Sequence, residues 1–131
     1  HYYGDFYHSG YESSLIDMKD QYFITNTVRA LKRVNHTLYV YDASGFIIID
    51  LDNRRIQGFF NNRLGGEGPK GVPDSLRGHY GGDFTMIYAL SKLDPKDLEI
   101  LWTMRKQYLE KSPQLMEDKD LFPLNLEDMA L

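Results

Sequence analysis

The sequence predicts an α+β fold in which helices flank a small antiparallel sheet. Two runs of β-branched and aromatic residues, Thr37–Tyr41 (TLYVY) and Phe46–Leu51 (FIIIDL), are separated by a turn and indicate a hairpin. Connected strands bracketed by helical patterns are typical of an α+β domain and not of a parallel βαβ sheet. The expected order is an N-terminal helix or helices, a three-stranded antiparallel meander, a glycine-rich loop and two C-terminal helices.

The N-terminal third begins with an aromatic, glycine-punctuated stretch, His1–Tyr11, that has no helical period. We expect its rings to cover an edge of the core. A helix is then predicted from Leu15, because either preceding serine, Ser13 or Ser14, can cap it. The i, i+3, i+7 spacing of one helical face is shared by Leu15, Met18 and Tyr22.

The next segment leaves two alternatives. Tyr22–Thr27 (YFITNT) is rich in β-branched and aromatic residues, which favours a strand or a break. Either one helix continues to about Val34, or Asn26 or Thr27 caps a second, short helix that carries Val28, Leu31 and Val34. Helix throughout is the preferred interpretation.

The meander is the clearest element of the sequence. Asp42-Ala43-Ser44-Gly45 has the composition of a hairpin turn, and a second turn at residues 52–55 leads into Ile56–Phe60. Phe46–Ile49 is apolar at every position. This run is therefore predicted to be the central strand, covered on both faces.

The C-terminal half is predicted to contain a loop and two helices. Asn61–Gly82 holds most of the eleven glycines of the chain. A helix is expected from Phe84, and Asp94 is expected to cap a last helix that has Pro95 at its first position. This helix is expected to end near Lys111, before a proline.

Two regions are distinguished along the chain. Residues 1–113 are predicted to form a single globular α+β domain, and residues 114–131 an acidic-apolar tail. The tail either packs against the surface of the domain or binds a partner protein. Its candidate partner-binding residues are Leu121, Phe122, Leu124 and Leu126.

Composition restricts the function classes. The 131 residues include no cysteine, which excludes disulfides, thiolate zinc sites and a cysteine nucleophile. The net charge of −4 argues against non-specific binding of nucleic acid. No apolar run approaches the ~20 residues that span a bilayer. We therefore expect a soluble protein without a membrane partner; the cytoplasm is favoured, while the compartment and the oligomeric state stay open.

The glycine-rich segment offers the first candidate site. Gly65–Gly71 (GGEGPKG) places a lysine among glycines, but it matches neither the Walker A pattern nor G-x-G-x-x-G. An anion site needs only backbone donors and cations. The candidate ligands for a phosphate-bearing compound are Lys70, Arg77, His79 and Asp83.

Other catalytic and metal-binding patterns fail. The four histidines are scattered without metal-ligand spacing. Asp50-Leu51-Asp52-Asn53 resembles the start of a calcium loop but lacks the required glycine and glutamate. No G-x-S-x-G elbow is present. The catalytic residues are therefore unknown, and no metal or cofactor is predicted.

Met86–Leu109 resembles the first helix pair of helix-turn-helix domains such as region 4 of sigma factors, in its A-L-x-x-L and D-x-x-x-L/I pattern. Such a family would place a polar, basic recognition helix next. The sequence instead continues with prolines and an acidic tail. DNA binding is thus the weakest of three hypotheses.

The preferred hypothesis is a non-catalytic protein-interaction or regulatory module with a protein partner. It depends on the 14% aromatic content, the acidic-apolar tail and the lack of an assembled catalytic pattern. The alternative is a small enzyme or ligand-binding domain that uses the glycine-rich loop to bind an anionic compound.

Overall fold

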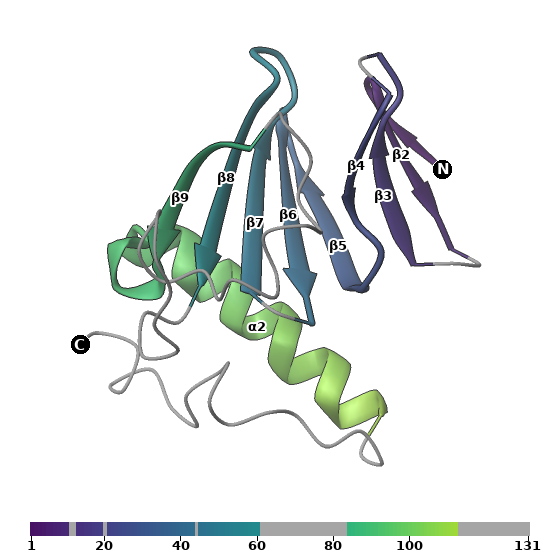
Figure 1. The fold of residues 1–131 in the computed structure, drawn as a ribbon. Helices are drawn as coiled ribbons and strands as arrows, with labels where there is room; N and C mark the ends of the chain where they lie inside the picture. Colours follow the sequence, from purple (N-terminus) through teal and green to yellow (C-terminus); the bar gives the residue numbers. More distant parts are fainter. Residues whose placement is uncertain (11–12, 20, 44, 61–83, 113–131) are drawn as a thin grey trace.

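The computed structural model describes residues 1–10, 13–19, 21–43, 45–60 and 84–112 (Figure 1). The first of its two sheets, sheet A, contains four antiparallel strands in sequence order. They are β1 (Tyr2–Tyr3), β2 (Phe6–Ser9), β3 (Ser14–Asp17) and β4 (Tyr22–Thr25).

The second sheet, sheet B, has five strands, also in sequence order. They are β5 (Val28–Val34), β6 (Thr37–Asp42), β7 (Gly45–Asp50), β8 (Arg55–Phe60) and β9 (Phe84–Ala89). Strands β5 to β8 are antiparallel neighbours, whereas β9 pairs with β8 in parallel. A short 3₁₀ helix, η2 (Leu90–Lys92), and the α-helix α2 (Pro95–Lys111) follow.

The core has two halves, one on each face of sheet B. Alternate residues of β6 and β7 point to opposite faces, as the period of two in a strand requires. On one face Ile47 and Ile49 belong to a buried cluster that includes residues of sheet A, and on the other Ile48 belongs to a cluster that includes residues of α2. Sheet B is therefore the middle layer, and the prediction that Phe46–Ile49 is a central strand covered on both faces is confirmed.

The predicted N-terminal helices are wrong, because the four strands β1 to β4 lie in this part of the chain and residues 28–34 form β5. A β-bulge explains part of the error. The register of β5 against β6 shifts between Val28 and Ala30, so Val28 and Leu31 both pack on the cluster facing sheet A. Three-residue spacing, which indicates a helix in a regular pattern, is produced here by one extra residue in a strand.

Short turns connect these strands in the segment where helix was expected. Asn35, between β5 and β6, has a left-handed φ of 55°, and the turn between β1 and β2 uses Gly4 at φ 60°. Val34 pairs directly with Thr37, so Asn35 and His36 make a two-residue hairpin loop. Asn and Gly tolerate positive φ better than most residues, which is why such turns form at these positions.

The predictions for the rest of the fold also need correction. The three strands expected between Thr37 and Phe60 do not form a separate meander, because β5 and β9 extend them to a five-stranded sheet. The first of the two expected C-terminal helices is wrong: Phe84–Ala89 is a strand. The chain combines sheets with a helix, as an α+β fold requires, but not in the predicted arrangement.

The last helix follows its prediction closely. Asp94 is the N-cap of α2, and its carboxylate accepts a hydrogen bond from the Lys96 N–H at 3.0 Å. Pro95 lies in the first turn, where a missing N–H leaves no bond unmade. The predicted cap and the predicted end near Lys111 are both confirmed.

Candidate functional site

Four uncharged side chains form a continuous row across the outer face of sheet A. The register pairs Tyr2 with Tyr7, Tyr7 with Ile16 and Ile16 with Phe23. Directly opposed residues of neighbouring strands point to the same side of a sheet, so these four share one face. The ring centroids of Tyr2 and Tyr7 lie 4.8 Å apart. We call Tyr2, Tyr7, Ile16 and Phe23 the aromatic row.

The ends of this row are open to solvent. Tyr2 is 61% and Phe23 55% exposed, and Met18, in the turn after β3, is 44% exposed. These three are the exposed large hydrophobic side chains of the part of the chain that the structure describes. The opposite face of sheet A carries the buried Phe6, Leu15 and Ile24. Clustering of exposed apolar residues on one face marks an interaction surface more strongly than the same residues scattered singly.

A buried ion pair fixes sheet A to sheet B. Arg54, in the turn between β7 and β8, bonds through Nη2 to Oδ2 of Asp17 at the end of β3. Its Nη1 donates to Oδ2 of Asp5 at 2.9 Å, and its guanidinium carbon lies 5.4 Å from the ring centroid of Phe6. The other oxygen of Asp17 accepts from the Lys19 N–H at 3.1 Å. Because the Asp17 carboxylate is buried, this contact is sensitive to loss of either partner.

A second polar cluster connects the two sheets at the corner between β4 and β5. Oδ1 of the fully buried Asp42 accepts from the hydroxyl of Thr25 at 2.7 Å and from that of Thr27 at 2.9 Å. The Ala43 N–H donates to the Thr27 carbonyl at 3.0 Å. With the Arg54 ion pair, this cluster attaches sheet A, which carries the aromatic row, to sheet B.

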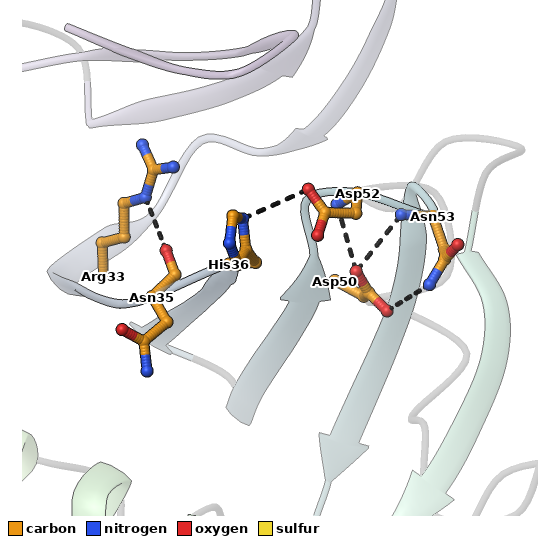
Figure 2. Close-up of polar contacts among 6 residues, drawn as sticks. All are labelled: Arg33, Asn35, His36, Asp50, Asp52 and Asn53. Carbon is orange, nitrogen blue, oxygen red and sulfur yellow. Dashed lines mark hydrogen bonds and ion pairs between the residues drawn. The ribbon is translucent and has the colours of Figure 1, made fainter.

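The polar surface shown in Figure 2 lies where two turns of sheet B meet. His36 Nδ1 is 3.3 Å from Oδ1 of Asp52, and the Leu51 N–H donates to the His36 carbonyl at 2.9 Å. Arg33 Nε donates to the Asn35 carbonyl at 2.9 Å. The His36 and Asp52 side chains are both more than half exposed, so water screens their interaction.

The sequence pattern that resembles a calcium loop has a structural role in this turn. Asp50 accepts hydrogen bonds from the Asn53 side chain at 2.8 Å and from the backbone N–H groups of Asp52 and Asn53 (Figure 2). The bonds from Asn53, followed by that from Asp52, lower the pKa of the Asp50 carboxyl. Over the described residues, no group of three or more His, Cys, Asp or Glu side chains is arranged to hold a metal ion.

Two further polar groups lie on the α2 side of sheet B. The Tyr39 hydroxyl donates to Oδ1 of Asp97 at 2.7 Å. Burial, and then this hydrogen bond to a carboxylate, raise the pKa of Tyr39 to about 12. Arg105 is buried with its guanidinium carbon 4.4 Å from the Trp102 ring centroid, and burial lowers its pKa. The Tyr39–Asp97 hydrogen bond attaches α2 to the sheet, whereas the Arg105–Trp102 contact lies within α2.

The site residues predicted from the sequence all lie outside the described residues. These are the anion-site candidates Lys70, Arg77, His79 and Asp83, and the partner-binding candidates Leu121, Phe122, Leu124 and Leu126. Both hypotheses therefore stay predictions. The aromatic row was not predicted as a site, although the excess of tyrosine and the ring-rich first segment were signals of a half-exposed face.

Comparison with known proteins gives no assignment. No protein-family model, curated protein or solved structure matches this chain at a significant level. Within the described ranges, no helix combines the length and apolar character needed to cross a bilayer.

Proposed function

We propose that this chain is a non-catalytic protein-interaction module that associates through the outer face of sheet A. The observation that carries the proposal is the aromatic row, an uncharged cross-strand stripe whose ends, Tyr2 and Phe23, are more than half exposed. Tyrosine and phenylalanine are enriched at the centres of protein interfaces, where charged residues are depleted.

The partner we propose is a second copy of the same face. A two-fold axis that lies between the two stacked sheets, parallel to their strands and opposite the middle of the row, places Tyr2 of one copy over Phe23 of the other, and Tyr7 over Ile16. An isologous interface has this self-complementary arrangement. The row carries no charge, so stacking it on its copy opposes no like charges. Two sheets would then pack face to face at about 10 Å.

The size of the row predicts a weak dimer. It crosses four strands and so spans about 14 Å, from the spacing of neighbouring strands. A standard interface covers roughly 800 Å² on each partner, and smaller ones are typically transient. We therefore expect dissociation in the micromolar range or weaker, about 8 kcal/mol of association free energy or less.

Sedimentation velocity over a wide range of protein concentration tests this proposal. The wild-type chain should sediment faster as its concentration rises, and Phe23→Ser should abolish that shift because it removes one exposed end of the row. Gln107→Ser, at an exposed position of α2, is the matched control and should behave as wild type. A chain that stays monomeric at millimolar concentration would refute self-association through this face.

A further inference from the structure

Strand β5 is an edge of sheet B. It is the terminal strand in the sheet order and pairs with β6 on one side (Figure 1). On its other side, within the described part of the chain, the Val28 N–H donates to the Ser13 carbonyl at 3.0 Å, and no strand pairs with the remainder. An antiparallel strand directs alternate N–H and C=O groups to each side, so an edge strand presents backbone donors and acceptors to an incoming chain.

The charged side chains of this edge strand are all positive. Strand β5 (VRALKRV) contains Arg29, Lys32 and Arg33 and no acidic residue, in a chain whose net charge is −4. Lys32 and Arg33 are exposed, and Arg29 lies with its guanidinium carbon 5.8 Å from the Tyr108 ring centroid. None of the three forms an ion pair with another described residue.

The two exposed cations lie on opposite faces of the sheet. Lys32 is opposite Tyr39, which belongs to the cluster on the α2 side, and Arg33 is opposite Leu38, which belongs to the cluster facing sheet A. A strand added beside β5 therefore meets a cation on each of its faces. On either side of this pair in the sequence, the half-buried Leu31 and Val34 leave apolar surface at the same edge.

The positive charges and the open backbone of β5 indicate which kind of molecule can bind at this edge. A second copy of β5 would bring cations close to cations along the shared edge, which destabilises cross-strand pairing. A nucleic acid offers charge but no ladder of peptide N–H and C=O groups, and the net negative charge of the chain opposes a polyanion. An extended peptide segment with carboxylates can pair with the backbone N–H and C=O groups of β5 and can also neutralise its cationic side chains.

We propose that β5 is a docking edge for an extended segment of a partner protein in which acidic and apolar residues are interspersed. The segment adds to sheet B as a further strand: main-chain hydrogen bonds to β5 supply affinity, and carboxylates facing Lys32 and Arg33 supply selectivity. The residues of β5 are separate from the aromatic row, so binding at this edge does not depend on self-association through sheet A.

The test measures fluorescence anisotropy of a fluorescein-labelled peptide of repeated Val-Val-Glu-Glu, in which adjacent glutamates point to opposite faces of a strand, titrated with the full chain. Lys32→Glu/Arg33→Glu should weaken binding by about tenfold or more, because it turns two cross-strand attractions into repulsions. Lys106→Glu, on the exposed side of α2, changes charge away from the edge and should bind as wild type. The same peptide with glutamine in place of glutamate should bind more weakly than the acidic one.

Amide hydrogen exchange supplies the structural readout. Binding should slow exchange in Leu31 and Arg33, and circular dichroism should show that each variant is folded. Absence of peptide binding at millimolar concentration, or equal binding by the charge-reversal variant, overturns the proposal. So does an oligo-dT probe that binds with the same dependence on Lys32 and Arg33, since this indicates a site for polyanions.

One competing occupant belongs to the chain itself. Residues 114–131 mix acidic and apolar residues. If Leu31 and Arg33 are protected from exchange in the free chain, and Glu117→Lys/Asp118→Lys removes that protection, the edge is occupied from within and the partner proposal is wrong. Unprotected amides in the free chain support an open edge.

Discussion

Removing the Arg54 charge should separate the contribution of the buried ion pair from that of the surrounding apolar contacts. Arg54→Met keeps a long side chain over Phe6 but leaves the buried Asp17 carboxylate without its guanidinium partner. Arg54 also bonds to Asp5, whose side chain is 53% exposed. Asp5→Asn is therefore a matched control that weakens only the solvent-exposed half of the contact.

The expected losses of unfolding free energy depend on how deeply each charge is buried. Breaking a buried pair by removing one partner typically costs about 3–5 kcal/mol, because the remaining charge is desolvated without compensation. The Arg54 side chain keeps 18% exposure, so we expect a loss of about 3 kcal/mol. Asp5→Asn should cost less than about 1 kcal/mol, as exposed pairs do. Arg54→Met/Asp17→Asn should recover part of the loss, because no charge is then buried.

Urea unfolding followed by the fluorescence of the single tryptophan, Trp102, and by circular dichroism measures these differences. Equal slopes of the unfolding free energy against urea are required before the variants are compared. Equal losses for Arg54→Met and Asp5→Asn would show that burial does not decide the strength of this contact. A double variant that is less stable than both single variants would lead to the same conclusion.

Three other predictions concern the core and the helix. Ile48→Ala should lower the unfolding free energy by ~2–5 kcal/mol in urea denaturation, and a loss below about 1 kcal/mol would place β7 outside the core. Asp94→Ala should cost ~0.5–2 kcal/mol in the same assay, because the Lys96 N–H loses its acceptor; an unchanged midpoint would contradict this. The raised pKa of Tyr39 means that the folded state holds the phenolic proton more tightly than the unfolded state, so stability should fall as pH rises from about 10 to about 12. Tyr39→Phe should reduce that fall and remove a component near pH 12 from an ultraviolet tyrosine titration, and an unaltered titration would contradict the assignment.

The parts of the fold that were predictable have local causes. Phe46–Ile49 is apolar at every position because both faces of β7 are covered. Asp94 and Pro95 form a start signal that depends only on the first turn of a helix. Neither prediction required knowledge of a distant residue.

The parts that failed depend on pairing between segments. The bulge in β5 gave Val28 and Leu31 a helical spacing, and only the register with β6 reveals it. Phe84–Ala89 becomes a strand by pairing in parallel with β8, which precedes it by a long connection. The aromatic row was missed for the same reason, because Tyr2 and Phe23 share a face only when four strands are in register.

The order in which the strands are joined has a consequence for the kinetics of folding. Strands β5 to β8 pair between sequence neighbours, whereas Tyr39 and Asp97, which join the sheet to α2, are 58 residues apart. Closing a long loop must precede such contacts, and non-local pairing is slow. We expect the antiparallel hairpins to form before the transition state, and β9 and α2 to join after it. Substitutions in α2 should then accelerate unfolding while leaving the refolding rate almost unchanged.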